Sequence, residues 1–518
     1  MRNRQYRRIK RHICLVPLIL IGGTLIAGQA GNDVSDSRTT LGRLAPKQSG
    51  AITASPWGIQ AGALDNSTMA RAATIGVKWT RLSASWRDIE REKGEYSWNK
   101  TDEAFDAALQ HGITPFVCLA VSNRLYCPEG PKADQRVVEI MGSNPLPPTK
   151  DPEAFKAWLR FVQSVVQRYK ERIHYWEVWN EPNHSLYWGA EPDGSEYGML
   201  LRETARVIKE VDPSAKVLGG AMAGIDPEFA DKFLAQGTAQ LVDIITFHHY
   251  ANTPEDRIYK AVQLWDVINK HKPSLQLWQG ECGYPSHSST RDFRGTSPWG
   301  VTIQAKWLLR QSFTDVFFCK ATLSNYFKLV HEGGRGEKPK RSFLTPLDSV
   351  LGFPERGGSR VKSVGVNEKC ILENPTLTPK PAYFAYQNLC ALFDDRYKPV
   401  AAPTEITVHD PGGFYGVGEE DDAFPSRPLV STFTTQNGRS LVAYWLPWHP
   451  QEMVREGRVD LVTGALAFSD PVLIDLLSGK VFPVDNMTRE GGVTTFHDVP
   501  LADYPFVIAE RSEVIIEP

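Results

Sequence analysis

Several features that would assign this chain to other classes of protein are absent from its sequence. Its 58 lysines and arginines stand against 60 aspartates and glutamates, so a net charge of −2 gives no electrostatic attraction to nucleic acid or to an anionic membrane. The phosphate-binding patterns GxGxxG and GxxxxGK do not occur. His331-Glu332 lacks the second histidine of HExxH, and no ligand cluster suggests zinc. We therefore predict no nucleic-acid partner, no nucleotide, no metal and no cofactor.

Cysteine is scarce, and its spacing does not form a disulfide framework. Of the seven cysteines, Cys14 lies in an amino-terminal apolar run, and the other six are scattered without a CxxC pair. Cys118 and Cys127 are the only close pair. The spacing leaves open one or two disulfides, or none.

The amino terminus has the order of residues found in a secretory signal peptide. Six basic residues within positions 1–12 precede an apolar run from Ile13 to about Gly28, which small residues close. A run of about 16 residues is shorter than the roughly 20 that a membrane span needs. We predict a signal peptide at 1–30, a linker at 31–50 and a secreted or periplasmic protein. Membrane attachment requires that this segment stay on as an uncleaved anchor.

From Trp57 onward, short strand-like runs alternate with amphipathic helical stretches. Helices are expected at 101–110, 151–172, 200–211 and 304–314. The expected strands are 57–60, 78–83, 114–120, 174–179, 216–220, 242–249, 275–280 and 319–327. Eight strands in alternation with helices predict an α/β fold, a (β/α)₈ TIM barrel over residues 51–398.

The alternation is interrupted and then replaced towards the carboxyl terminus. A long loop rich in glycine and charged residues is expected at 328–380, before a helix at 381–393. The runs 440–446, 471–477, 492–497 and 505–510 are β-branched or alternating, and no helix follows them. Residues 399–518 are therefore predicted to form a C-terminal antiparallel β-sandwich domain.

Two of the barrel strands end in a glutamate. HYWEVWNEPN at 174–183 contains Glu181, and LWQGECG at 277–283 contains Glu281. Two carboxylates at the ends of separate strands are what a retaining glycosidase uses, one as proton donor and one as nucleophile, about 5–5.5 Å apart. The alternative interpretation is a strand-end turn and an unrelated surface carboxylate.

These segments resemble a known group of enzymes. Trp179–Asn183 resembles the acid/base motif of clan A glycoside hydrolases, Trp278–Glu281 resembles their nucleophile strand, and DIITFHHY at 243–250 resembles their sixth strand. The resemblance to the clan spans roughly 57–393, and the segment WEVWNEPN is most similar to the family 39-like group, which includes β-xylosidases and iduronidases. The resemblance implies a retaining hydrolase with Glu181 as acid/base, Glu281 as nucleophile and a carbohydrate as substrate.

Further residues are expected around the sugar. The resemblance implies that Arg81 supports the nucleophile and that residues on the sixth strand surround the sugar, while Asn180 can bind its 2-hydroxyl. Position after a strand makes Asn123 and Trp188 candidates for lining the cleft, and Tyr326 a candidate stacking platform, with core packing as the alternative. The candidate substrate-binding residues are thus Arg81, Asn123, Asn180, Trp188, His248, His249, Tyr250 and Tyr326.

Other functions share parts of this pattern. A catalytically silent carbohydrate-binding barrel would have lost one of the two carboxylates, whereas both are present. A transglycosidase would share every residue named, and a clan A arabinofuranosidase or glucuronidase is the nearest rival in substrate. The sequence favours a secreted retaining hydrolase of a plant or microbial polysaccharide or oligosaccharide.

Overall fold

The computed structural model describes residues 38–62, 65–129, 146–250, 253–286, 300–330, 369–373, 376–414, 427–448 and 451–518. The predicted signal peptide at 1–30 and most of the predicted loop at 328–380 lie outside these residues. The unit Thr39–Pro518 contains both the barrel and the C-terminal sheets. Among the described helices, none has the length and apolar character that crossing a bilayer requires.

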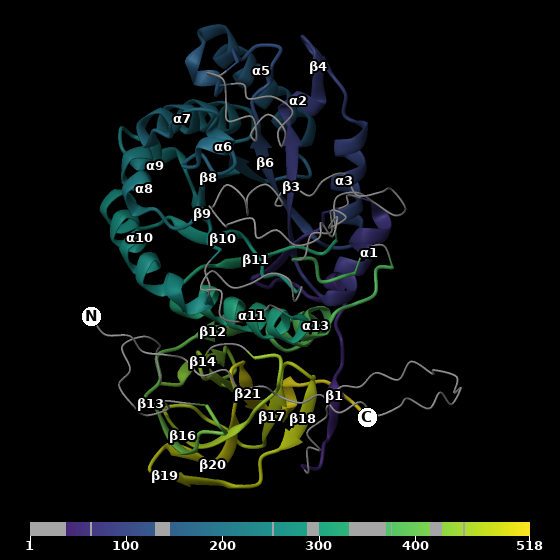
Figure 1. Cartoon of the computed structure of the whole chain (residues 1–518), viewed down its shortest axis with the longest axis vertical. Coiled ribbons are helices and arrows are strands. Elements are labelled where there is room, and N and C mark those ends of the chain that lie inside the picture. The colour runs from purple at the N-terminus through teal and green to yellow at the C-terminus, as the bar shows by residue number, and fades with distance from the viewer. Residues whose placement is uncertain are drawn as a thin grey trace, which may run out of the picture. The chain divides into compact units, whose positions relative to one another are not determined.

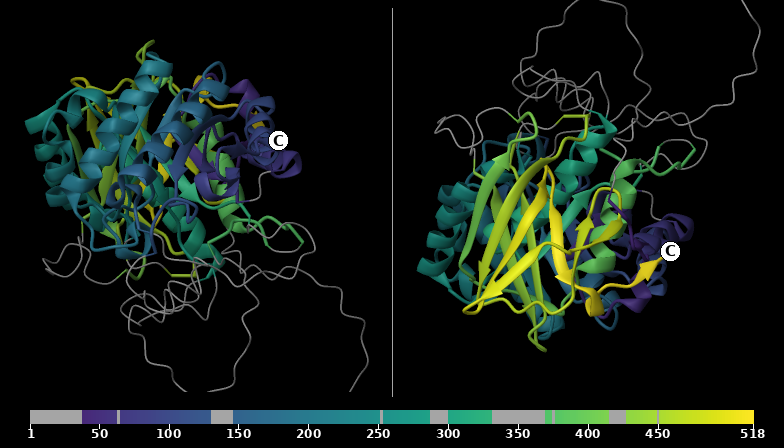
Figure 2. Two further views of the ribbon diagram at one scale, coloured as in Figure 1. Left: turned by 90° about the horizontal axis from the view of Figure 1, so that it is seen from above. Right: turned by 90° about the horizontal axis from the view of Figure 1, so that it is seen from below.

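The predicted (β/α)₈ barrel is confirmed. Eight parallel strands close in the order β10-β11-β2-β3-β6-β7-β8-β9, and helices surround them (Figures 1 and 2). The barrel strands are β2 Trp57–Gln60, β3 Trp79–Ser85, β6 Thr114–Ala120, β7 Tyr175–Val178, β8 Lys216–Ala223, β9 Ile244–His248, β10 Gln276–Cys282 and β11 Leu323–Phe327. Each overlaps the run that predicted it.

Several of the helices, among them α1, α5, α7 and α8, begin at an aspartate whose side chain caps the first turn. Asp151 caps the longest predicted helix by accepting hydrogen bonds from the amides of Glu153 and Ala154, and Pro152 stands at its first position. The longer helices are α1 Asn66–Ile75, α3 Asn99–Gln110, α5 Pro152–Tyr169, α7 Gly194–Val211, α8 Pro227–Leu234, α10 Ile258–His271, α11 Val301–Phe313 and α13 Pro381–Leu392. Short helices α2 Trp86–Ile89, α6 Ser185–Trp188 and α9 Thr238–Leu241 lie in connections.

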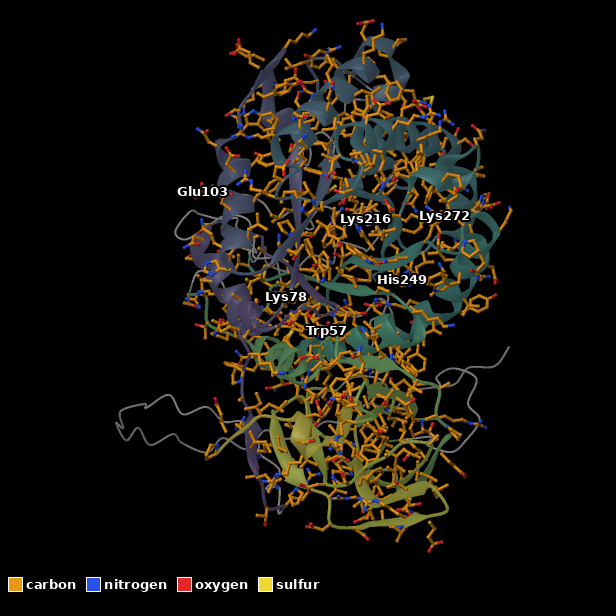
Figure 3. All side chains as sticks on the ribbon, turned by 180° about the vertical axis from the view of Figure 1, so that it is seen from behind. Trp57, Lys78, Glu103, Lys216, His249 and Lys272 are labelled. Atoms are coloured by element: carbon orange, nitrogen blue, oxygen red, sulfur yellow. The ribbon has the colours of Figure 1, made fainter. Side chains whose placement is uncertain are left out.

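Side chains inside the barrel follow the two-residue period of its strands. Near the strand starts, Trp79, Phe116 and Tyr175 pack around Trp278, with ring centroids 5.1 to 5.6 Å from it. Lysines such as Lys78 and Lys216 lie at or just before strand starts (Figure 3). Two residues further along β3 and β7, the inward positions become charged. An apolar layer thus closes one end of the barrel and places its polar groups towards the other.

The predicted C-terminal β domain contains two antiparallel sheets (Figure 2). The larger sheet has the order β12-β14-β15-β21-β17-β18-β1-β22, and the smaller has the order β13-β16-β20-β19. Their strands are β12 Tyr397–Pro399, β13 Thr404–Asp410, β14 Leu429–Thr435, β15 Ser440–Trp445, β16 Gly457–Gly464, β17 Pro471–Asp475, β18 Lys480–Pro483, β19 Met487–Glu490, β20 Val493–Leu501, β21 Phe506–Glu510 and β22 Ile516–Glu517. Apolar residues of both sheets share one core.

One part of the predicted linker at 31–50 belongs to this larger sheet instead. Residues Gly42–Leu44 form β1, in which Gly42 is paired with Val481 and Leu44 with Ile516. The side chain of Leu44 is buried in the core that it shares with the C-terminal sheets. A polar, glycine-containing stretch predicted a linker, but pairing across more than 400 positions of sequence has no local signal.

Aromatic and apolar side chains join the barrel to the C-terminal domain. Phe313 at the end of α11 lies with its ring centroid 6.1 Å from that of Trp445 and 6.0 Å from that of Phe393. Phe393 in turn packs edge-on against Phe433, 4.7 Å away. Buried ring contacts of this kind stabilise the interface. The six cysteines among the described residues are all buried, and none of them forms a disulfide.

Candidate active site

The chain makes a sharp turn where β7 ends, and this turn places Glu181. Trp179 and Glu181 have positive φ angles of 71° and 47°, which non-glycine residues rarely adopt. Neighbouring strands supply the compensating bonds, because the Trp179 amide donates to the Leu119 carbonyl (2.8 Å) and the Glu181 amide to the Ala221 carbonyl (2.9 Å). The strain is therefore maintained by the barrel around it, as is common at functional sites.

A register irregularity in β10 places the second carboxylate. Gly280 faces the barrel interior, since a Cβ added there would lie 3.2 Å from His248 Nε2 and 3.5 Å from Glu177 Oε1. Strict alternation would then turn Glu281 outward. The pairing of β10 with β11 shifts between Gln279 and Cys282, and Glu281 faces inward as a result.

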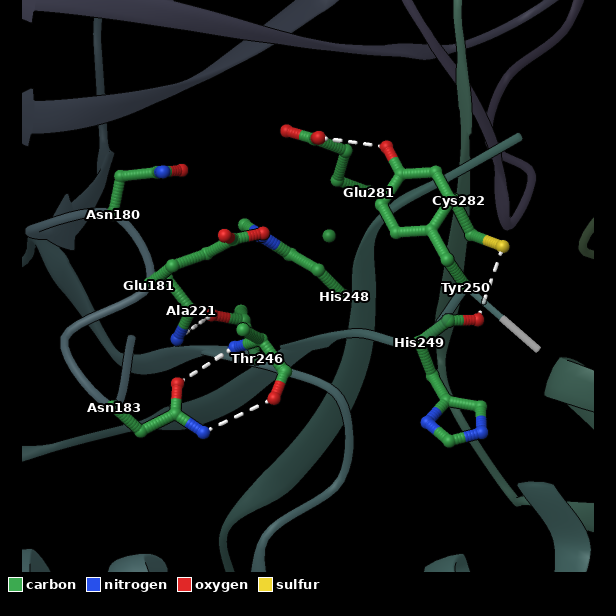
Figure 4. A network of polar contacts seen from close by, with 12 residues as sticks. Asn180, Glu181, Asn183, Ala221, Thr246, His248, His249, Tyr250, Glu281 and Cys282 are labelled. Carbon is green, nitrogen blue, oxygen red and sulfur yellow. Dashed lines mark hydrogen bonds and ion pairs between the residues drawn. The ribbon is translucent and has the colours of Figure 1, made fainter. Parts of the chain in front are cut away.

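Glu281 has the partners that an ionised carboxylate needs. The Tyr250 hydroxyl donates to its Oε1 at 2.7 Å (Figure 4), and Arg81 Nη1 donates to its Oε2 at 3.0 Å. Burial opposes ionisation, but the nearby His248, Arg81, the Tyr250 bond and Lys369 together lower the pKa of Glu281 below its ordinary value. Burial and the charge of Glu281 raise the pKa of Tyr250, so its hydroxyl stays a donor.

Glu181 lies beside Glu281 and has a different partner. His248 Nδ1 lies 3.1 Å from Glu181 Oε1 in a buried position. One oxygen from each carboxylate and one nitrogen of His248 all lie within 4.8 Å of one another. The two glutamates, 100 positions apart in the sequence, thus form a close pair, and among the described residues a guanidinium contacts Glu281 but not Glu181.

A third carboxylate, absent from the sequence predictions, lies beneath this pair. Glu177 on β7 is fully buried and accepts hydrogen bonds from Arg81 Nε at 2.7 Å and from the Thr246 hydroxyl at 2.6 Å. Arg81 also donates to Asn180 Oδ1 at 2.9 Å, so its fork is fixed by two carboxylates and an amide. A charged residue inside an otherwise apolar strand, as in WEV, is the signal that would have indicated Glu177.

The cluster of Glu181, His248 and Glu281 also has the ligand types of a metal site. However, Tyr250 donates to one oxygen of Glu281 and the Arg81 guanidinium to the other. A bound cation would be repelled by Arg81 and would have to displace these donors. The arrangement therefore suits proton transfer and nucleophilic attack better than metal binding.

Four of the residues predicted to contact the sugar lie away from the pair of Glu181 and Glu281. Asn123 is buried, donates to the Glu90 carbonyl at 2.8 Å and accepts from the Leu125 amide, which braces its own loop. Trp188 is fully buried against Trp179 and Tyr197. Tyr326 is buried, with its hydroxyl directed at the Tyr284 carbonyl. For Tyr326 the structure shows the core-packing alternative, and Asn123 and Trp188 are likewise buried.

The aromatic ring that the eighth strand places against Tyr250 is that of Phe327. It lies next to Tyr326 in sequence, is partly exposed, and has its ring centroid 6.4 Å from that of Tyr250. Alternation along the strand turns adjacent residues to opposite faces, so a displacement of one position changes which ring can reach a substrate. The sequence alone did not distinguish the two.

His249 is the fourth residue that the structure places away from the pair. Its imidazole points to the opposite side of Tyr250 from Glu181 and Glu281 (Figure 4). Burial, together with the charges of Arg257 and Lys260, lowers the pKa of His249 to about 3. A neutral histidine beside cations is a packing group, whereas the adjacent His248 and Tyr250 contact Glu181 and Glu281.

Replacing His249 with glutamine is expected to leave kcat/KM within about threefold of the parent, since no reacting group touches the ring. The pKa is depressed on folding, so the native state binds fewer protons than the unfolded state between about pH 6.5 and 3. The contribution of neutral His249 to the free energy of unfolding is therefore fully present above the unfolded-state pKa, near 6.5, and it decreases as the pH falls below that value. The Tm advantage of the parent over His249→Gln should therefore shrink between pH 7 and pH 4 in thermal unfolding; a constant difference would contradict this account.

Part of the chain that carries these residues matches known sequences. The sequence model described as "Glycosyl hydrolases family 39" matches residues 69–265, which include Arg81, Glu181 and His248 and end before Glu281. A β-xylosidase of Geobacillus stearothermophilus is 29% identical over 179 residues, which is 32% of this chain and 34% of the relative. The match thus spans about a third of that relative's length.

Solved structures share the fold across both domains. A family 39 glycoside hydrolase from Bacteroides cellulosilyticus superposes with a TM-score of 0.61 and 18% identity, covering 88% of this chain and 81% of that one. A monomeric β-xylosidase from Caulobacter crescentus gives a TM-score of 0.54 at 18% identity, covering 90% of this chain and 97% of that one. These findings confirm the resemblance to the family 39-like group.

Proposed function

We propose that this chain, a family 39-like (β/α)₈ barrel protein, is a retaining glycoside hydrolase that cleaves O-glycosidic bonds by double displacement. The observation that carries the proposal is the close pair of Glu181 and Glu281 with unlike partners. One oxygen of each lies within 4.8 Å of the other, which is closer than the roughly 6.5–9.5 Å of inverting enzymes and therefore supports retention.

The contacts of each glutamate suggest its role. Glu281, which Arg81 and Tyr250 favour as an anion, attacks the anomeric carbon while the glycosidic bond breaks. Glu181 gives its proton to the departing oxygen and then takes a proton from the water that releases the sugar. His248, at 3.1 Å, fixes the Glu181 carboxyl group. Asn180, oriented by Arg81, is placed to bind the 2-hydroxyl of the reacting sugar.

The substrate that we propose is a β-linked glycoside of a plant or microbial polysaccharide or oligosaccharide, with a β-xyloside as the first to test. Relatives with the word β-xylosidase in their names support that choice. The basic, apolar and small-residue order of residues 1–30 supports export from the cytoplasm as part of the same proposal. Amino-terminal sequencing of the exported protein would test the cleavage near residue 30.

Product stereochemistry tests the reaction class. The chain from residue 31 onward would be incubated with aryl β-xyloside, glucoside, galactoside and glucuronide, aryl α-arabinofuranoside and soluble polysaccharides, and the first sugar released would be observed by proton NMR. We expect the anomer of the substrate to appear first, with its mutarotated partner later. The opposite anomer appearing first would contradict double displacement, and binding without release would favour a carbohydrate-binding protein.

A further inference from the structure

A buried arginine outside the reacting pair contacts the chain on both sides of it. Arg257 ends the short 3₁₀ helix η3 Pro254–Arg257 and is fully buried. Its Nη2 donates to the His249 carbonyl at 3.0 Å and to the Cys282 sulfur at 3.3 Å. His249 directly precedes Tyr250, and Cys282 directly follows Glu281. One guanidinium thus joins the two backbone segments that carry the Tyr250–Glu281 hydrogen bond.

Other buried groups fix the orientation of Arg257. Its Nη1 pairs with Asp315 at 2.7 Å, and Asp315 accepts a further bond from the Ser324 hydroxyl at 2.8 Å. Nη2 also lies 3.1 Å from the Tyr284 hydroxyl. Burial opposes the charge on Arg257, but Asp315 raises the pKa of Arg257 above its ordinary value. A rigid planar donor in this position cannot move without breaking several bonds.

The same 3₁₀ helix is anchored in the C-terminal domain. Glu255, two positions before Arg257, accepts both Nε and Nη2 of Arg310 at 2.8 and 2.7 Å and the indole N–H of Trp445 at 2.8 Å. Trp445 ends β15 of the larger C-terminal sheet. Arg310 Nη1 donates to the Trp448 carbonyl at 2.7 Å. All the side chains that make these bonds are buried.

We infer that the C-terminal domain positions the nucleophile through η3: Trp445 and Arg310 fix Glu255, and Arg257 then fixes Tyr250 against Glu281. Arg257 and Glu255 are positioning residues, since neither touches the reacting atoms. The inference rests on the proposed function, in which Glu281 attacks the substrate. It assigns the second domain a role in the reaction besides folding.

The expected signature is a change in the protonation of Glu281. A carboxylate stays ionised at low pH only while its donors remain in place. Among the described residues, the charged and titratable groups around Glu281 are Arg81, Cys118, Glu177, Glu181, His248, Tyr250 and Lys369, and Cys282 follows it in the chain. Only Tyr250 and Cys282 belong to segments that Arg257 contacts, so a disturbance of η3 acts on the tyrosine donor and leaves the Arg81 contact.

The experiment compares Trp445→Phe and Glu255→Gln with Lys306→Gln. Phenylalanine keeps the ring bulk and removes one donor, whereas glutamine keeps the shape of Glu255 and removes its charge. Lys306 is the matched control, because its Nζ pairs with Asp503 at 2.8 Å in the same buried interface without contacting η3. For each protein, kcat and KM would be measured across the acid side of the pH profile, together with Tm.

We expect Glu255→Gln to lower kcat roughly tenfold, with KM little changed, and to move the acid limb of kcat/KM upward by about half a pH unit or more. Trp445→Phe should produce a smaller change of the same sign. Lys306→Gln should lower Tm while the acid limb stays in place. An unmoved acid limb and a kcat within twofold of the parent in both η3 variants would overturn the inference, whatever their Tm.

A structural measurement separates this inference from the proposed function. If the parent releases no sugar from any substrate, a crystal structure of Glu255→Gln still reports the separation of the Tyr250 hydroxyl and Glu281 Oε1, which is 2.7 Å in the parent chain. A longer separation or a rotated Tyr250 supports the positioning role while the function fails. An unchanged contact overturns the positioning role.

Discussion

Replacing Glu281 with alanine is expected to lower kcat/KM by roughly 10⁴-fold or more, because the covalent intermediate can no longer form. Glu281→Gln should lose as much, since the amide keeps the shape of the side chain but is not a nucleophile. Both variants should keep the fold, because Glu177 still pairs with Arg81 at 2.7 Å. Release of aryl leaving groups, measured by absorbance with Tm determined in parallel, checks this result.

An external nucleophile makes the test specific. Azide has room to occupy the space left in Glu281→Ala and to attack the same face of the sugar directly, giving a glycosyl azide of inverted configuration. Glu153→Ala is the matched control, because that glutamate is largely exposed on α5 and pairs only with Lys156. Near-parent activity in Glu281→Ala, or equal loss in Glu153→Ala, would contradict the assignment of the nucleophile.

The pH dependence of the parent has a definite sign. The pKa of Glu281 is depressed in the folded chain, so the anion persists below the ordinary glutamate range near 4.5. kcat/KM should fall on the acid side only below that range. By linkage, the same group contributes stability above its unfolded pKa and loses it as pH falls through the folded pKa. An acid limb well above pH 5 in the parent would contradict this.

Replacing Glu181 with alanine is expected to have an effect that depends on the leaving group. Loss of the general acid should cost roughly 10²–10⁴-fold with a poor leaving group such as an alkyl alcohol or a sugar. A dinitrophenolate needs no protonation, so its release in the first step should change much less, and the second step should then limit turnover. Rates for a series of aryl glycosides of graded leaving-group pKa would measure this.

Azide again distinguishes the two carboxylates. In Glu181→Ala the covalent intermediate on Glu281 still forms, and azide attacks it from the other face, so the glycosyl azide keeps the configuration of the substrate. Equal losses for good and poor leaving groups would show that Glu181 does not act as the acid. An inverted azide would assign the nucleophile role to Glu181 instead.

The barrel was predictable because its signals are local. Each barrel strand is a short apolar run between turn-forming residues, and the alternation with helices admits few arrangements of parallel strands. The cap Asp151-Pro152 likewise marks the start of α5 within the sequence itself. Where a partner lies far away in the chain, prediction failed: β1 at Gly42–Leu44 pairs with strands near positions 480 and 516.

Some residues of the candidate site were likewise predictable from local sequence, and others were not. WNEPN and QGE indicated both carboxylates, because glutamates at strand ends are visible in one sequence. The sequence did not show whether the side chains of His249, Tyr326 and Phe327 face the barrel interior or the surrounding helices. Side chains alternate between the two faces of a strand, so a shift of one residue exchanges the faces. Glu177 was missed because its counter-charge, Arg81, lies 96 positions earlier.

The sequence by itself determined which residue types meet at the carboxyl ends of the strands: two glutamates, an arginine, a histidine and a tyrosine. Only the tertiary structure decided how they face one another. The irregular pairing of β10 at Gln279–Cys282 turns Glu281 inward. The domain interface fixes η3 behind Tyr250 through Glu255 and Trp445. Both depend on contacts between distant segments, because a side chain's direction is set by the packing around its strand rather than by its own neighbours in sequence.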